Sequence, residues 1–282
     1  MEEHDVNVFK FVKMHGAAND FVLIDDREER FPVHDHLRLA ALAASRTGIA
    51  CEGVILLQKS SKVDFKMVFF NPDGTEAELC GNGARCVAAF ARETGAVRSD
   101  SMTFETRAGL LDAEIVGDGL VKIWMPDPKG RRYGLEVEGW QGDLVVAGVP
   151  HFVVNCPNVA KVDVDGEGRK LRLAAEFAPE GANVSFAQFK APNRINLRTY
   201  ERGVEAESGA CGTGAVASAV VGVETKGLSL PIHVRTQGGF DLTVDADWRR
   251  GKSTGYTLTG PVQRVFEGSI DIDALDIGNE ME

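Results

Sequence analysis

The chain has 282 residues, of which 44% are hydrophobic and 26% are charged, and its formal net charge is −11. This length suits two domains of modest size, and the composition argues against disorder. The negative charge opposes phosphate backbones, so nucleic-acid binding would need a local basic patch. The two candidate patches, residues 129–132 and 249–250, are short and indicate solvated loops, so we expect no nucleic-acid partner.

The first five residues are acidic and lack the features of a secretion signal, and no apolar run is long enough to span a membrane. We therefore expect a cytoplasmic protein without a membrane partner. Five cysteines, an odd number, favour thiols over a disulfide framework. Cys80 and Cys86 are six positions apart with no histidine nearby, so no metal site is predicted.

The first half predicts a β-rich domain with two helices. Helices are expected at residues 37–46, after Asp35 as N-cap, and at 83–94, before Gly95. The segment that begins at Asn71 has the composition of a turn. Strands are expected at residues 8–14, 21–25, 54–57, 63–70, 102–107, 110–116 and 120–125, the last two joined by a turn at 117–119.

The second half repeats this plan after a Pro/Gly-rich break at residues 126–130. Helices are expected at residues 169–177 and from Cys211 to about 225, before Gly227. Strands are expected at residues 144–147, 184–189, 195–200, 234–237, 240–244, 256–258 and 263–266. We therefore predict an α+β fold with two similar domains, each an antiparallel curved sheet or open barrel around a central helix. The predicted domains are residues 1–125, to which 262–282 return, and residues 126–261, with the active site in the cleft between them.

The strongest motif occurs once in each half. Cys80 and Cys211 each begin a Cys-Gly-x-Gly segment, each follows a glutamate by four positions, and each precedes an Ala/Val-rich helix. A helix N-terminus leaves backbone N–H groups without partners and carries partial positive charge, which favours a thiolate and holds a carboxylate. Two such units predict a reaction on an amino acid. One thiolate removes the proton from the α-carbon, and a protonated thiol on the opposite face returns a proton, so that the configuration inverts.

Other polar residues are candidates for supporting roles. His151, expected in a turn after a strand, and Glu201, at the end of a strand, could each polarise one of the two cysteines. Arg202 and Asn183 could bind a distal carboxylate. Cys51, Cys86 and Cys156 are expected to be packing residues, as buried cysteines usually are.

These residues resemble those of the diaminopimelate epimerase family along the whole chain. The matching segments are residues 13–21, 71–86, 148–151, 181–184 and 201–214, in the order that the family has. The resemblance implies conversion of LL-2,6-diaminopimelate into meso-diaminopimelate, on the route to lysine and peptidoglycan. It also implies a small-molecule amino-acid substrate, no cofactor or metal, and a homodimer.

The resemblance assigns roles residue by residue. Cys80 and Cys211 become the two acid/base groups, assisted by His151 and Glu201 as further catalytic residues. The α-carboxylate is held by backbone N–H groups, and other polar side chains contact the substrate. The implied substrate-binding set is Asn19, Asn71, Gly81, Asn82, Asn183, Arg202, Gly212 and Thr213.

Two other functions remain open. Ala18 stands where the family usually has glycine, and the sequence near Gly53 and at Val149 departs from a common substrate-binding pattern. These departures allow a racemase of another amino acid, such as histidine or proline, on the same fold. A third possibility is a non-catalytic ligand-binding or redox-sensing module, in which Cys80 and Cys211 form a reversible disulfide.

Overall fold

The computed structural model describes residues 7–117, 119–246 and 255–277. The described residues form two compact units, one drawn from 1–121 and 262–282 and the other from 122–261. The acidic residues 1–5, the basic pair 249–250 and Asp118 of the expected turn lie outside the described residues.

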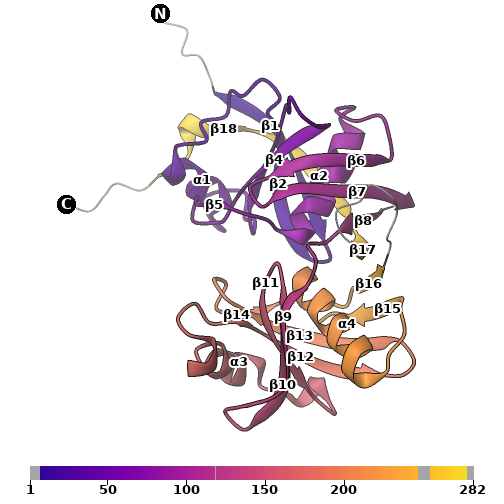
Figure 1. Ribbon diagram of the computed structural model, residues 1–282. Coiled ribbons are helices and arrows are strands. Elements are labelled where there is room, and N and C mark those ends of the chain that lie inside the picture. Colours follow the sequence, from indigo (N-terminus) through magenta and orange to yellow (C-terminus); the bar gives the residue numbers. More distant parts are fainter. Residues whose placement is uncertain (1–6, 118, 247–254, 278–282) are drawn as a thin grey trace, which may run out of the picture. The chain divides into compact units, whose positions relative to one another are not determined.

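The first unit is built mainly from strands (Figure 1). Its β18 comes from the end of the chain and pairs antiparallel with β1. Its elements are β1 (Val8–Gly16), β2 (Asn19–Asp25), α1 (His36–Ala43), β3 (Val54–Gln58), β4 (Phe65–Phe70), β5 (Glu76–Ala77), α2 (Gly81–Glu93), β6 (Ser101–Thr106), β7 (Gly109–Gly117), β18 (Gln263–Asp271) and the 3-10 helix η3 (Ile272–Ala274).

Strand β8 (Leu120–Trp124) crosses the boundary between the units, and from β10 onward the second unit follows the order of elements that the first has from β1. Its elements are β9 (Lys129–Val137), β10 (Trp140–Ala147), β11 (Val149–Asn155), η1 (Val159–Lys161), α3 (Val164–Arg172), η2 (Ala175–Phe177), β12 (Asn183–Lys190), β13 (Arg194–Glu201), β14 (Ala206–Ser208), α4 (Gly212–Lys226), β15 (Ile232–Arg235), β16 (Asp241–Ala246) and β17 (Tyr256–Pro261).

The strand pairings reveal an internal duplication. In the first unit β1–β2 is antiparallel, β2–β3 parallel, β3–β4 antiparallel and β4–β6 parallel. The second unit repeats this series as β10–β11, β11–β12, β12–β13 and β13–β15. The predicted α+β class with two similar halves is therefore confirmed. The sheets are mixed rather than purely antiparallel, because a helix-containing connection joins the members of each parallel pair.

Each unit surrounds one central helix. Helix α2 contacts β1, β2, β3, β4 and β7, and α4 contacts β10, β11, β12, β13, β16 and β17. Glycine permits the close approach at the start of α2, because a Cβ on Gly83 would lie 2.9 Å from Ile55 Cδ1. Helix α4 ends at Gly227, which has φ 69° and adopts the left-handed conformation that glycine tolerates. The sequence predicted both helices and both terminating glycines.

Several element predictions were wrong in position. The helix expected at 169–177 is α3, which starts at Val164 because Asp163 caps it by accepting from Gly166 N, and ends at Arg172. The sequence did not indicate a helix at this position because Gly166 and Gly168 disfavour one. Gly168 is nevertheless required for packing, since a Cβ there would lie 2.5 Å from Tyr200 Cβ. Strand β9 begins inside the expected break at 126–130, and strand β11 was not predicted.

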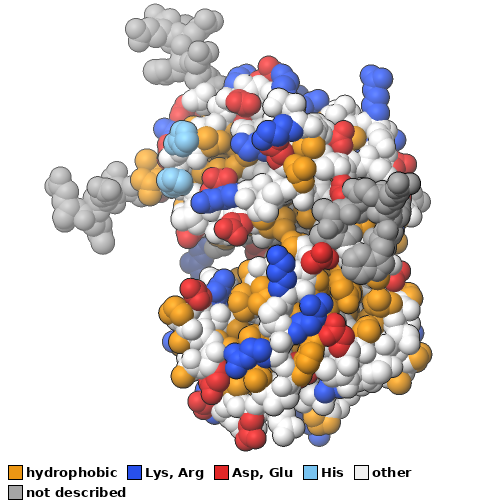
Figure 2. Space-filling view, in the orientation of Figure 1, with side chains coloured by type: hydrophobic (Ala, Val, Ile, Leu, Met, Phe, Trp, Pro, Cys, Tyr) orange, Lys and Arg blue, Asp and Glu red, His pale blue; other side chains and the backbone are white. Residues whose placement is uncertain are grey.

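Charges of both signs are scattered over the visible face of each unit (Figure 2). The candidate basic segment at 129–132 is partly neutralised, since Arg131 Nε lies 3.2 Å from Glu224 Oε1. Within the described ranges, no helix is long and apolar enough to cross a membrane.

Candidate active site: two cysteine half-sites

Cys80 is the N-cap residue of α2. Its backbone is extended, with φ −126° and ψ 118°, and its Sγ accepts a hydrogen bond from Gly83 N at 3.5 Å. The side chain is half-buried, whereas the other four cysteines are buried, and none of the five forms a disulfide. Cys80, Gly81 and Asn82 thus form the Cys80 half-site, with the thiol at the positive end of the helix dipole.

The neighbouring loop packs directly onto this helix start. A Cβ on Gly16 would lie 2.8 Å from Asn82 O, so the turn between β1 and β2 needs glycine there. Ala17 and Ala18 continue the turn with φ 57° and 70°. Asn19 follows, and its side-chain Oδ1 is buried without a hydrogen-bond partner. An unpaired buried acceptor of this kind is available to a ligand donor.

Asn71 lies in the turn after β4. Its Nδ2 donates to Thr75 Oγ1 at 3.2 Å, and its backbone N donates to Thr75 O at 2.8 Å. The turn needs glycine at position 74, where φ is 81° and a Cβ would lie 2.1 Å from His36 O. The predicted turn is therefore confirmed, and these hydrogen bonds between Asn71 and Thr75 lie within it.

Cys211 is the N-cap residue of α4 and is 4% exposed. Its Sγ lies 3.4 Å from Thr213 Oγ1. Burial raises the pKa of the Cys211 thiol well above its usual value, and the nearby Glu201 carboxylate raises it further. Burial also raises the pKa of Glu201. Cys211 is therefore held as a thiol at neutral pH, in contrast to the thiolate that its helix position alone would favour.

His151 lies on strand β11 and is fully buried, whereas the sequence predicted a turn. The Gly148-Val149-Pro150 segment predicted the turn. In the structure the chain turns at Gly148, which has φ 82°, and strand β11 begins at the next residue. Burial, and then the charge of Arg202, lower the pKa of His151 to about 3. The imidazole is therefore neutral at physiological pH, with one ring nitrogen as donor and the other as acceptor.

A chain of hydrogen-bonding groups connects His151 to Cys211. His151 Nε2 lies 2.9 Å from Thr213 Oγ1, and that hydroxyl lies 3.4 Å from Cys211 Sγ. On the other side of the ring, Nδ1 lies 3.1 Å from Ser185 Oγ, which lies 3.5 Å from Thr199 Oγ1. We call these five residues the Cys211 relay. Since each hydroxyl can donate or accept, the relay can match either protonation state of the thiol.

Asn183 orients one end of this relay. Its Oδ1 accepts from Arg202 N at 2.8 Å, which leaves its Nδ2 directed at His151 Nε2, 3.4 Å away. The donor favours an acceptor at Nε2 and hence the proton on Nδ1. The Arg202 side chain reaches Glu180 O at 3.5 Å. The second unit therefore assembles, around Cys211, the four predicted residues His151, Asn183, Glu201 and Thr213.

The sequence analysis did not single out three polar residues that belong to the Cys211 relay or lie next to the Cys80 half-site. Ser185 and Thr199 are buried and lie opposite each other on β12 and β13. The two-residue period of a strand could have indicated them, because residues two positions apart lie on the same face of a sheet. Ser185 is two positions from Asn183 on one strand, and Thr199 is two positions from Glu201 on the next. The third, Arg85, is fully buried in α2, and the helical pattern around it predicts only an amphipathic helix.

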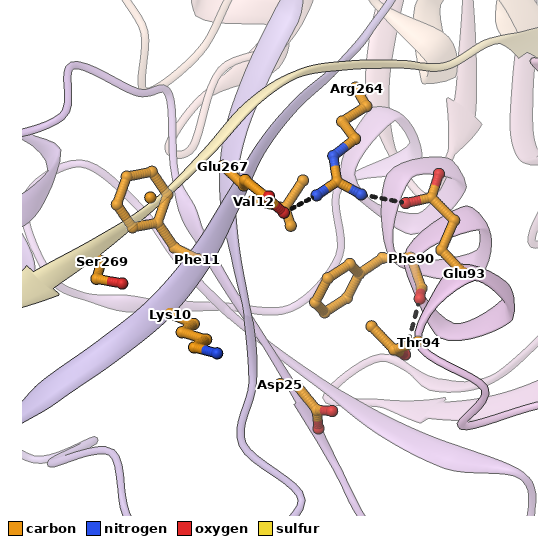
Figure 3. A pocket seen from close by; sticks show the side chains of 11 residues that line it. Lys10, Phe11, Val12, Asp25, Phe90, Glu93, Thr94, Arg264, Glu267 and Ser269 are labelled. Atoms are coloured by element: carbon orange, nitrogen blue, oxygen red, sulfur yellow. Dashed lines mark hydrogen bonds and ion pairs between the residues drawn. The ribbon is translucent and has the colours of Figure 1, made fainter.

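A cavity of about 560 Å³ in the first unit contains none of the candidate site residues (Figure 3). There the Arg264 guanidinium of β18 pairs with Glu93 of α2 at 3.4 Å and also with Glu267. The pair with Glu93 connects strand β18 to the last residue of the central helix, whereas Glu267 lies on β18 itself. In the described part of the chain, no group of three or more His, Cys, Asp or Glu side chains is arranged to hold a metal ion.

The duplicated fold, with a helix at the centre of each unit, resembles the folds of solved structures of other proteins. A phenazine biosynthesis protein of the PhzF family from Bacillus anthracis superposes with a TM-score of 0.70 at 16% identity, covering 93% of this chain and 99% of that one. A probable proline racemase from Agrobacterium radiobacter K84 gives 0.71 at 19% identity, covering 95% and 94%. At these identities the likeness concerns the fold.

Sequence comparison identifies the family. The diaminopimelate epimerase family model matches residues 11–129 and 144–265. A diaminopimelate epimerase from Aquifex aeolicus is 41% identical over 95% of this chain and 99% of its own length. One from Chlorobaculum tepidum is 36% identical, over 92% and 100%. The chain belongs to the diaminopimelate epimerase family, as its motifs predicted.

Proposed function

We propose that this protein epimerises LL-2,6-diaminopimelate to meso-diaminopimelate through two thiol bases. The observation that carries the proposal is the pair of cysteines at equivalent positions: Cys80 caps α2 and Cys211 caps α4 in a duplicated fold. The relatives named diaminopimelate epimerase, similar over nearly the full chain, support the choice of substrate.

The chemistry follows from the different surroundings of the two thiols. Cys80, half-buried at a helix N-terminus, is the natural base that removes the α-proton as a thiolate. Cys211, held as a thiol by burial and by Glu201, is the natural acid that delivers a proton to the opposite face. After this step Cys80 carries the abstracted proton and Cys211 is a thiolate, which the Thr213 hydroxyl, itself bonded to His151, can stabilise by donating a hydrogen bond. The mechanism requires both thiols to reach one α-carbon from opposite faces, and the configuration then inverts.

Backbone donors stabilise the charge that develops. Deprotonation at the α-carbon shifts negative charge onto the carboxylate, and the first N–H groups of a helix are suited to receive it. Gly81, Asn82, Gly212 and Thr213 supply these groups in our proposal. Asn19, Asn71, Asn183 and Arg202 would contact the rest of the substrate, with Arg202 suited to a second carboxylate because of its bidentate geometry.

We also propose that the enzyme acts in the cytoplasm as a homodimer and without pyridoxal phosphate. The thiols and helix donors supply the acid, the base and the charge stabilisation for which other racemases use the cofactor. Sedimentation velocity tests the dimer. Activity that survives hydroxylamine and a metal chelator would support a cofactor-independent reaction, and loss of activity that pyridoxal phosphate restores would contradict it.

The decisive test is incubation of the purified protein with LL-diaminopimelate, followed by chiral chromatography. We expect conversion to the meso form, and slower or no change for L-histidine and L-proline in parallel incubations. Activity on another amino acid with none on diaminopimelate would replace our first choice by a racemase of that substrate. If the reduced protein converts none of them, a ligand-binding or redox-sensing role would be favoured.

A further inference from the structure

Arg85 is the least expected residue next to the Cys80 half-site. Its side chain is fully buried, and it folds back along α2 toward the helix start. Nη2 donates to Asn82 Oδ1 at 2.7 Å and Nη1 donates to Gly81 O at 3.3 Å, while Nε has no hydrogen-bond partner. The guanidinium therefore lies beside the backbone of the same two residues that follow Cys80.

A cation in this place is unfavourable unless an anion compensates it. Arginine keeps its charge in proteins, and burial without a counter-ion is costly. The N-terminal end of a helix is already positive, so basic side chains are stabilising at the other end. The two acceptors, Asn82 Oδ1 and Gly81 O, are neutral oxygens, and Arg85 forms no ion pair with a carboxylate among the described residues.

Few ionisable groups near Arg85 can supply the negative charge. Those whose charge acts on its guanidinium are Cys86 and Cys80. Cys86 is fully buried, and burial raises its pKa far above the usual value, so it stays a neutral thiol. Asp20 of β2 acts on Cys86, but its own carboxylate is paired with Lys13 of β1. Cys80 is left as the group that can carry the compensating charge.

We infer that Arg85 is a positioning residue that stabilises the thiolate of Cys80 and orients Asn82 beside it. Its buried charge and the first N–H groups of α2 act on the same sulfur from within the unit. The same charge then favours the binding of an anionic substrate group at the helix start. This inference extends the proposed function, because it explains why Cys80 rather than Cys211 starts as the base.

The test measures the thiolate directly and needs no substrate. The alkylation rate of Cys80 by iodoacetamide is followed from pH 5 to 10, with peptide mapping by mass spectrometry to separate it from the four buried cysteines. We expect Arg85→Met to lower the rate at pH 7 about tenfold and to move the inflection up by roughly one pH unit. Arg85→Lys keeps a charge and should stay closer to the wild type.

The matched control is Arg92→Met, on the same helix. Arg92 is half exposed and pairs with Asp100 at 3.0 Å, so its removal should leave the Cys80 profile unchanged. An unchanged profile in folded Arg85→Met, as judged by circular dichroism, would overturn the inference. If that variant does not fold, the pH profile of Cys80 alkylation in the wild type is the test. An inflection of that profile at or above about 8.5, the ordinary pKa of a thiol, would also overturn the inference. Because turnover is not measured, failure here is distinct from failure of the proposed substrate.

Discussion

His151 Nε2 lies 2.9 Å from Thr213 Oγ1, and this contact joins a buried neutral imidazole to the residue that also touches Cys211. The contact joins strand β11 to the first turn of α4, which are 62 positions apart. It gives the buried thiol a hydrogen-bond route to the imidazole that does not require the thiol itself to be exposed.

Thr213→Val should interrupt this route while keeping the shape of the side chain. We expect kcat to fall about tenfold to a hundredfold, within the range for a lost acid–base contribution, with a smaller change in KM. Thr225→Val is the control, because Thr225 lies on the same helix and its hydroxyl bonds only to Val221 O in the described structure. Equal activities for the two variants would exclude a role for the relay.

Gly214→Ala should disturb the relay by volume alone. The added Cβ would lie 2.9 Å from Ser185 Oγ, 3.1 Å from Thr199 Oγ1 and 3.3 Å from His151 Cε1. We expect activity to fall at least tenfold, although alanine is the better helix former by about 1 kcal/mol. Gly222→Ala is the matched control, since its nearest neighbours would be side-chain carbons of Leu228 and Phe189, the closest at 3.0 Å, and not members of the relay. A fully active Gly214→Ala would mean that the spacing around His151 is not critical.

The buried imidazole sets a clear pH dependence. With a pKa of about 3 in the folded state against an ordinary value of 6.5, His151 binds its proton more readily when the chain is unfolded. Stability from this group is therefore fully present above about pH 6.5 and falls as the pH drops toward 3, by at most about 1.4 kcal/mol per pH unit. NMR titration should show no protonation of the His151 ring between pH 7.5 and 4.5. Exposed His233 is the internal comparison, and a His151 inflection near 6.5 would refute this prediction.

Ala18→Gly should stabilise the protein. Ala18 has φ 70°, a conformation that costs a residue with a Cβ about 1–2 kcal/mol, while glycine loses more backbone entropy on folding by about 0.5–1 kcal/mol. The expected net gain is about 0.5–1 kcal/mol, measured as a higher urea midpoint. Ala44→Gly, at φ −57°, should instead lower the midpoint. A loss of stability in both variants would show that Ala18 is not strained.

The sequence allowed prediction of the parts that depend on local chemistry. The Cys-Gly-x-Gly segments placed Cys80 and Cys211 at helix starts, and Gly95 and Gly227 marked the ends, because caps and terminators act within one turn. The α+β class followed from the order of strands and helices.

What could not be predicted depends on contacts between distant elements. The glycine and proline that precede His151 predicted a turn, yet strand pairing with β12 makes His151 part of a sheet. Ser185 and Thr199 acquire a role only through their cross-strand register. Arg85 has an ordinary helical spacing, and its complete burial follows from the strands that surround α2.

The central claim is that two thiols move one proton each, and solvent isotope exchange tests it most directly. In D₂O the wild type should place deuterium at the α-carbon of the product as it converts LL- into meso-diaminopimelate. Cys80→Ala and Cys211→Ala, each on its own, should abolish epimerisation. Conversion at the wild-type rate in either single variant would contradict the two-base account.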